Sequence, residues 1–114
     1  HKEANPASST RGRYVEMNAK RGKYYEKNFF ECQPALNYGF AKPDPNQPWV
    51  QPVTAPGPQA VRREMRNIMA FWFDKVVDGF RVDMASSLVK NDWGKKEVSK
   101  LWNEMREWKD KNYP

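Results

Sequence analysis

The second half of the chain contains a single segment that alternates like a β-strand, and an amphipathic helical pattern lies on each side of it. Residues 80–85 alternate in side-chain type with period 2. The flanking apolar stripes recur every three or four residues: Val61, Met65, Ile68, Trp72 and Val76 before the segment, and Val98, Leu101, Trp102, Met105 and Trp108 after it. Helix, strand and helix in this order form the repeating unit of a parallel α/β fold. One strand forms no sheet, so the helices need partners from either a larger barrel or an oligomer.

Glycine and proline residues mark the expected ends of the two helices. Gly57-Pro58 is a favourable start for the first helix, because proline in the first turn loses no hydrogen bond. Asp78-Gly79 is its expected end, because glycine is preferred just beyond a helix C-terminus. The second helix is expected after Gly94. Several charged residues point away from the apolar stripe and are expected in solvent: Arg62, Arg63, Glu64 and Arg66.

The first half of the chain shows no comparable periodicity. Residues 1–28 mix small, basic and aromatic side chains, which predicts a long loop with one helical turn. Residues 29–33 are a short extended candidate. Prolines at positions 43, 45, 48, 52, 56 and 58 exclude a regular helix or a central strand between residues 41 and 58, which predicts a covering loop. Trp49 within this loop is either packed against the protein or a platform for a sugar ring.

The composition limits the function classes without choosing one of them. The 114 residues include 20 Lys and Arg against 14 Asp and Glu, and the formal charge of +6 favours an anionic partner only if the charges cluster. The single cysteine, Cys32, excludes an internal disulfide. No apolar run approaches the roughly 18 residues of a membrane span, so no membrane partner is expected. The chain begins at His1 and stops directly after a helical pattern, so we expect processed or truncated ends and further functional residues outside it.

The alternating segment carries the residues best suited to chemistry. A period of 2 places Arg81 and Asp83 on the same face of the expected strand. A guanidinium group favours the ionised form of a neighbouring carboxyl group, which keeps the carboxylate available as a nucleophile at neutral pH. The spacing alone leaves a second interpretation open, in which the two residues form a structural ion pair at the end of a sheet.

Two motifs resemble those of the α-amylase family of glycoside hydrolases. Residues 78–85, Asp-Gly-Phe-Arg-Val-Asp-Met-Ala, are similar to its nucleophile strand, with the pattern G-F/x-R-x-D after a helix. Residues 33–37, Gln-Pro-Ala-Leu-Asn, are similar to its Q/M-P-D-L-N segment, found after the third barrel strand. The resemblance implies an α/β fold in which this chain is a fragment of a (β/α)8 TIM barrel and does not close a barrel alone. Residues 1–58 would be the loop-rich segment after the third strand, and residues 59–114 the helix–strand–helix segment that carries the nucleophile.

The same resemblance implies roles for individual residues. Asp83 would be the nucleophile that forms a covalent glycosyl-enzyme intermediate, and Arg81 would orient it and hold it ionised, in a retaining reaction on an α-glucan or oligosaccharide. Asn37 and Trp49 would contact the substrate. The second carboxyl group that this chemistry requires is expected outside the chain, so we expect the isolated chain to be inactive.

Departures from the family pattern limit what the resemblance implies. Ala35 stands where the Q-P-D-L-N segment has Asp, so we expect no metal site, and no cofactor is implied. Ser86 and Ser87 occupy positions where many members place Lys and His toward the acceptor sugar, so acceptor specificity does not transfer. The family's Asn-His segment is absent, because the only histidine is His1.

Two alternatives from other classes remain. Basic residues interleaved with tyrosines have the composition of a nucleic-acid-binding segment, although no binding-module motif accompanies them. These residues are Arg11, Arg13, Lys20, Arg21, Lys23 and Lys27, with Tyr14, Tyr24 and Tyr25. The apolar stripes would also suit a helical interaction module, and they predict self-association of the isolated chain. The resemblance favours a carbohydrate partner and no nucleic acid.

Overall fold

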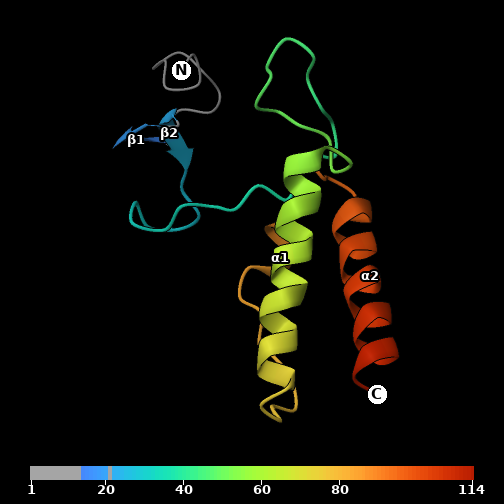
Figure 1. The fold of residues 1–114 in the computed structure, drawn as a ribbon. Coiled ribbons are helices and arrows are strands. Elements are labelled where there is room, and N and C mark those ends of the chain that lie inside the picture. Colours follow the sequence, from blue (N-terminus) through green and yellow to red (C-terminus); the bar gives the residue numbers. More distant parts are fainter. Residues whose placement is uncertain (1–13, 21) are drawn as a thin grey trace. The chain divides into compact units, whose positions relative to one another are not determined.

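The computed structural model describes residues 14–20 and 22–114 (Figure 1). The chain divides into two compact units, residues 1–36 and residues 37–114. The expectations for residues 1–13 and for Arg21 lie outside the described residues. The boundary expected from the sequence lies at residue 58 instead. That boundary rests on the expected barrel topology and not on contacts within this chain, so it stays a prediction.

A β-hairpin forms about half of the described part of the first unit. Strand β1, Tyr14–Ala19, pairs antiparallel with strand β2, Gly22–Glu26, and the register places Val15 opposite Tyr25. The loop expected over residues 1–28 is therefore wrong for these two segments. Tyrosine and valine favour a pleated strand, and cross-strand pairs of such residues stabilise a hairpin. The sequence pattern of one strand alone does not reveal this pairing.

A loop tied at its base follows the hairpin. Lys27 and Pro34 form an isolated bridge, and Asn28 N–H donates to the Gln33 carbonyl at 2.8 Å. The extended segment predicted over residues 29–33 is wrong, because these residues form bends and a turn. A turn satisfies backbone groups that an unpaired extended segment would leave without partners.

Two parallel helices dominate the second unit (Figure 1). Helix α1 spans Pro56–Phe73 and helix α2 spans Lys96–Asn112. Both run in the same direction, so the residues between them return along the length of the helices. The predicted starts are confirmed to within a few residues, since proline occupies the first turn of α1 and α2 begins just after Gly94. Residues 41–55 form turns, bends and one isolated bridge, as their prolines predict.

The end of α1 differs from the prediction. The helix ends at Phe73, and in the following turn Val76 N–H donates to the Phe73 carbonyl at 2.9 Å and Val77 N–H to the Trp72 carbonyl at 3.4 Å. This pair of bonds is a Schellman motif, which requires a left-handed residue at its centre. That residue is Val76, with a φ of 65°, and not the expected Gly79.

The strand predicted over residues 80–85 is also wrong for this chain. The backbone of residues 79–82 has no regular structure, Asp83 and Met84 form a turn, and the short 3₁₀ helix η2 spans Ala85–Ser87. A strand requires hydrogen bonds from a neighbouring strand. The only sheet within the described residues is the β1–β2 hairpin. Residues 74–95, the return segment between α1 and α2, therefore have no strand partner there.

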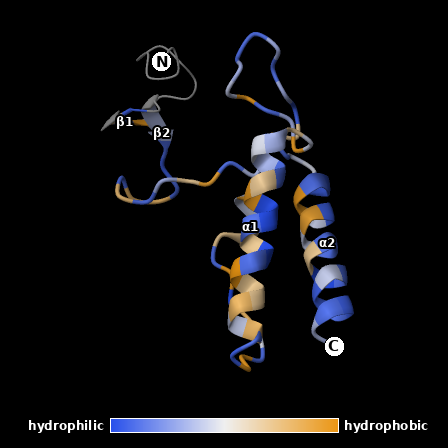
Figure 2. Ribbon diagram, in the orientation of Figure 1, coloured by the Kyte–Doolittle hydropathy of each residue, from blue (hydrophilic) through white to orange (hydrophobic). Residues whose placement is uncertain are grey.

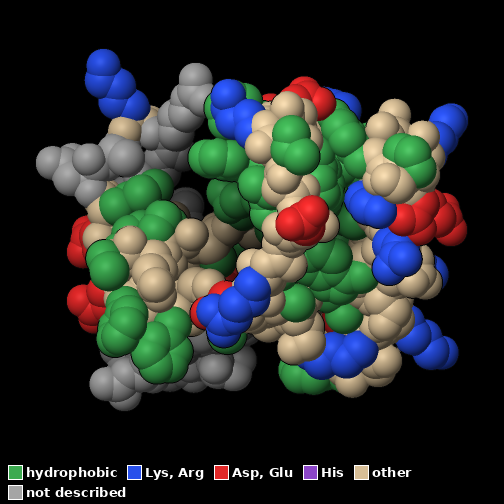
Figure 3. Space-filling model, turned by 90° about the horizontal axis from the view of Figure 1, so that it is seen from below, with side chains coloured by type: hydrophobic (Ala, Val, Ile, Leu, Met, Phe, Trp, Pro, Cys, Tyr) green, Lys and Arg blue, Asp and Glu red, His purple; other side chains and the backbone are tan. Residues whose placement is uncertain are grey.

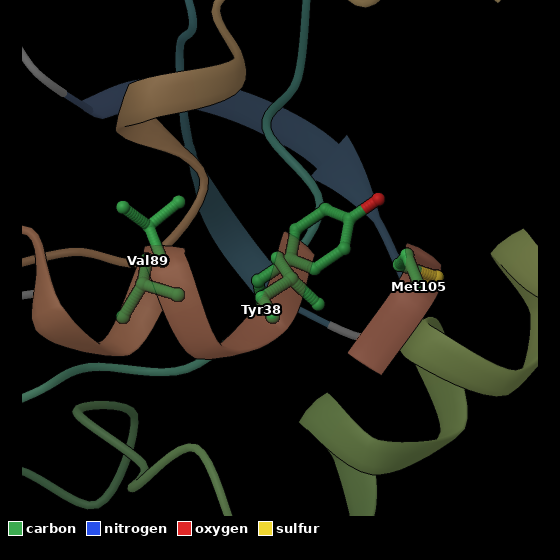
Figure 4. Close-up of a cluster of buried hydrophobic side chains, with 5 residues drawn as sticks. Tyr38, Val89 and Met105 are labelled. Carbon is green, nitrogen blue, oxygen red and sulfur yellow. The ribbon is translucent and has the colours of Figure 1, made fainter. Parts of the chain in front are cut away.

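The core of the second unit gathers around one face of α2. Val98, Leu101 and Met105 are buried with Tyr38 and Val89, which come from two loops (Figure 4). The apolar face predicted for α2 is therefore confirmed as a buried face. Partly buried side chains from α1, the loops and α2 itself pack against this cluster: Val61, Met65, Met69, Ala41, Val53, Leu88 and Trp102.

The apolar stripe of α1 is buried along one edge only. Hydrophobic residues recur along its length (Figure 2), yet several of them remain exposed. With the residues that follow the helix, the exposed apolar surface comprises Ile68, Phe71, Trp72, Val76, Phe80, Val82 and Met84. Figure 3, which views the molecule from the end where α1 finishes, shows hydrophobic side chains gathered at that end. The broad buried face predicted for α1 is thus wrong for the chain alone.

Three backbone segments meet beside the core. Phe40 bridges Pro52 and also Lys90, so it joins the proline-rich loop to the end of the return segment. Gly39 has a φ of 94°, and a Cβ there would lie 2.6 Å from the Val53 Cα. Only glycine accommodates both this conformation and this approach of two backbones.

A buried carboxylate caps the start of α2. Asp92 is 8% exposed, and its Oδ2 accepts Val98 N–H at 2.8 Å. The N-cap residue, Lys95, has a left-handed φ of 56° and makes no side-chain cap. Asp92 therefore pairs one of the N–H groups that a helix start leaves unbonded, and its negative charge suits that end of the helix dipole.

Arg62 contradicts the expectation of a solvated charge. It is 3% exposed, and its Nη1 lies 3.1 Å from Oε2 of Glu104 on α2. Among the described residues, no hydrogen-bond acceptor reaches its Nε or Nη2. Burial raises the pKa of the Tyr38 hydroxyl, and the charge of Arg62 opposes this shift. The expectation failed because α1 meets α2 along one edge of its apolar stripe, where Arg62 lies.

Replacing Val76 with glycine should raise the free energy of unfolding by about 1 kcal/mol. Val76 is 86% exposed, so little packing is lost, whereas a left-handed backbone is most costly for a β-branched residue. Urea unfolding of the 114-residue chain measures the change. The control Val76→Ala keeps the Cβ and should gain clearly less. An equal gain in both variants would mean that backbone strain is not the cause.

Neutralising Glu104 should destabilise the chain more than removing Arg62. Glu104→Gln leaves the buried guanidinium without its countercharge, with an expected loss of about 1–2 kcal/mol, because the Glu104 side chain is itself half exposed. Arg62→Met removes the buried charge and preserves side-chain length, so its effect should be near zero or stabilising. Urea unfolding of both variants gives the comparison. A larger loss for Arg62→Met would show that the ion pair is a net source of stability.

Candidate active site

Local hydrogen bonds build the turn that carries Asp83. Met84 adopts a left-handed φ of 56°, and its carbonyl accepts the N–H of Ser87 at 3.0 Å and the Oγ–H of Ser87 at 2.9 Å. Met84 N–H donates to Oδ1 of Asp83 at 3.2 Å. The carboxylate therefore precedes a short 3₁₀ helix and does not lie within a strand.

Arg81 and Asp83 lie together at the surface. Arg81 Nη2 is 3.5 Å from Asp83 Oδ1, and the two side chains are 87% and 78% exposed. Within the described part of the chain, Arg81 and Met84 supply the hydrogen bonds to the carboxylate, and both reach Oδ1. This arrangement holds one carboxylate oxygen, and none of the hydrogen bonds found among the described residues reaches Oδ2.

Three side chains from outside η2 bind the backbone carbonyl groups that follow the candidate nucleophile. The contacts are Trp102 Nε1–H to Ala85 at 2.9 Å, Lys95 Nζ to Ser86 at 3.0 Å, and Lys90 Nζ to Ser87 at 2.9 Å. A turn of three residues cannot pair its own last carbonyls, and nearby cations and N–H donors commonly do so. The sequence assigned Trp102 only to an apolar stripe, because no sequence signal identifies a backbone carbonyl as its partner.

The two predicted substrate contacts have different surroundings. Asn37 Nδ2 donates to Gln51 Oε1 at 3.0 Å, and Asn37 Oδ1 accepts Gly39 N–H at 3.0 Å. One end of this amide therefore joins two loops, and the other end stabilises its own turn. Trp49 is half-buried in the proline-rich loop. A role of either residue in binding a sugar stays a prediction.

The described residues bear on three other classes of site. Over residues 14–20 and 22–114, no group of three or more His, Cys, Asp or Glu side chains is placed to hold a metal ion. None of the helices described is both long and apolar enough to cross a bilayer. Arg11, Arg13 and Arg21 lie outside the described residues, so the nucleic-acid alternative stays untested.

The second unit thus consists mainly of two parallel helices and a segment that returns between them and carries an exposed arginine–carboxylate pair. Residues 2–113 match the family described as alpha amylase, catalytic domain. The chain belongs to this family, which confirms the resemblance found in its motifs. The family's domain is a (β/α)8 barrel, whereas the described residues form two strands and two α-helices and no closed barrel.

Curated relatives of the chain are much longer proteins. The chain is 33% identical over 89 residues to a salivary alpha-glucosidase of Aedes aegypti, covering 78% of this chain and 12% of that protein. It is 33% identical over 98 residues to a trehalose synthase of Pimelobacter sp. (strain R48), covering 82% and 14%. It is 36% identical over 75 residues to an oligo-1,6-glucosidase of Parageobacillus thermoglucosidasius, covering 66% and 10%. The chain thus spans less than a sixth of each of these relatives. No solved structure matches it at a significant level.

Removing either member of the surface pair should leave the stability of the 114-residue chain almost unchanged. Arg81→Met and Asp83→Asn should each alter the free energy of unfolding by less than about 0.5 kcal/mol, because exposed pairs are screened by water. Urea unfolding at low and high salt provides the measurement. A loss above about 1 kcal/mol that disappears at high salt would favour the structural ion-pair interpretation instead.

Proposed function

We propose that this chain is a section of a retaining glycoside hydrolase or transglycosylase that acts on α-glucans, with Asp83 as its nucleophile. The observation that carries the proposal is the accessible Arg81–Asp83 pair within the return segment, in a chain of the α-amylase family. A structural ion pair would be expected to be buried or to join separate elements. This pair is exposed and joins residues only two positions apart, so it has little structural purpose.

The proposed reaction uses the carboxylate as a covalent catalyst. Asp83 Oδ2 attacks the anomeric carbon of the substrate and forms a glycosyl ester while the bond to the leaving oxygen breaks. Arg81 stays beside Oδ1 and orients the carboxylate for attack. A second carboxyl group, roughly 5 Å away, protonates the leaving oxygen and then deprotonates the attacking water or sugar hydroxyl. We assign that group to a part of the enzyme outside this chain.

The parallel helices support the placement of residues 59–114 as one barrel unit. In a β/α barrel each strand runs opposite to the helices on both sides of it, and the segment between α1 and α2 follows this path. Residues 1–58 then precede the unit as the loop-rich segment after the third strand. In the whole enzyme a neighbouring strand would pair with residues 79–82, which precede the turn at Asp83 and Met84, and the exposed apolar surface of α1 would pack against the barrel.

The substrate class rests on the family and on the names of its relatives. An alpha-glucosidase, an oligo-1,6-glucosidase and a trehalose synthase all align with this chain. A glycosyl ester on Asp83 serves both hydrolysis and transfer, because the acceptor enters only in the second step. Asn37 and Trp49 are the substrate contacts that we propose within this chain. For Asn37, contact with a sugar would replace its hydrogen bond to Gln51.

Asp83→Asn in the whole enzyme should lower turnover by at least about 1,000-fold, because an amide keeps the shape but cannot form the glycosyl ester. Arg81→Met should lower it by about 100-fold through loss of orientation and charge. Turnover of maltooligosaccharides and the melting temperature are measured on the same samples. Asp78→Asn, which changes an exposed carboxylate nearby, is the matched control and should be active.

Azide provides a second test of the same assignment. In Asp83→Ala the anion should enter the space of the missing carboxylate, attack the anomeric carbon of an activated α-glucoside and give a β-glucosyl azide. Product configuration is read by NMR. An Asp83→Asn enzyme with near-normal turnover, or an azide product of retained configuration from Asp83→Ala, would end the nucleophile assignment.

A further inference from the structure

The backbone that follows Asp83 is held partly by residues that lie far from it in sequence. The Ala85 carbonyl accepts a hydrogen bond from Trp102, which lies within α2, and the Ser86 carbonyl accepts one from Lys95, the N-cap residue of α2. The Met84 carbonyl is used inside the turn by Ser87. The position of Asp83 therefore depends on α2 as well as on its own turn.

Trp102 is the better fixed of these two donors. Its ring packs against the buried cluster around Leu101, and its indole N–H is partly shielded from water. Lys95 is exposed and reaches the turn with a long, flexible side chain. A partly buried hydrogen bond from a rigid ring restrains the backbone more firmly than one from an exposed lysine, because water readily replaces the carbonyl as the partner of the lysine ammonium group.

We propose that Trp102, assisted by Lys95, is a positioning residue for Asp83. The proposal rests on the proposed function, in which Asp83 is the nucleophile. Trp102 fixes the carbonyl of Ala85, this fixes the left-handed turn at Met84, and the turn directs the carboxylate of Asp83. Trp102 touches neither substrate nor carboxylate, so its effect passes through the backbone of residues 84–85.

The test uses the whole enzyme and the variant Trp102→Phe, which keeps an aromatic ring and removes the N–H. Nucleophilic attack is isolated with an activated 2-deoxy-2-fluoro glucoside, which slows breakdown of the glycosyl ester so that mass spectrometry can follow its formation. We expect the rate of ester formation and kcat to fall by about 10- to 100-fold, because small displacements of a nucleophile are costly. KM should change by less than about twofold, since substrate binding is not altered.

A matched control lies on the same helix. Trp108 contacts Tyr113 near the end of α2, and Trp108→Phe should leave ester formation unchanged. Equal slowing in Trp102→Phe and Trp108→Phe would overturn the proposal, because it would reflect general loosening of the helix. Ester formation at the wild-type rate in folded Trp102→Phe would also overturn it.

A second variant keeps the test decisive if Trp102→Phe does not fold. Lys95→Met removes the donor to Ser86 at an exposed position, and it should slow ester formation by a few-fold with an unchanged melting temperature. No slowing in that variant would overturn the role of α2 in holding the turn. Asp83→Asn is measured in parallel. If it retains turnover, the proposed function itself has failed, whereas an inactive Asp83→Asn beside normal Trp102→Phe and Lys95→Met refutes only the positioning role.

Discussion

The burial of one face of α2 against two loops is the interaction on which the second unit depends. Leu101 is 1% exposed, and Tyr38 and Val89 from the loops complete the cluster around it. Burial of a side chain of this size contributes roughly 1.5–3 kcal/mol. Tyr38 and Val89 lie next to the bridge between Phe40 and Lys90, so their burial also holds two distant loops in register. The return segment from α1 to α2 is thereby restrained where it ends.

The same helix joins the core to the candidate nucleophile. The ring of Trp102 packs against the core, and its N–H donates a hydrogen bond to the carbonyl of Ala85. One side chain therefore contributes both to core packing and to the geometry of the site. The Arg81–Asp83 pair itself remains in water, where its electrostatic interaction is weak. Covalent catalysis benefits from a site that excludes water. In the proposed enzyme the other strands and loops of the barrel supply that exclusion.

The sequence correctly predicted the elements that are determined by residues close to one another in the chain. Proline placement correctly excluded regular structure before α1, and the spacing of Val98, Leu101 and Met105 identified the buried face of α2. The strand over residues 80–85 was predicted from a pattern suited to a sheet that the described chain lacks. The hairpin was missed because its stability comes from pairs across two strands, such as Val15 with Tyr25. Arg62 was expected in solvent but is buried. The spacing of apolar residues on α1 does not indicate which edge of the apolar stripe packs against α2.

By itself the sequence determined the family, the candidate pair Arg81 and Asp83, and the two helices, because short motifs and helical periodicity depend only on residues near one another in the chain. Only the tertiary structure decided that Val76 and not Gly79 ends α1, that Asp92 caps α2, and that Trp102 binds the turn after Asp83. Each of these depends on which backbone groups lack a partner once the helices have packed. That information arises from contacts between distant segments, and no local pattern of side chains encodes it.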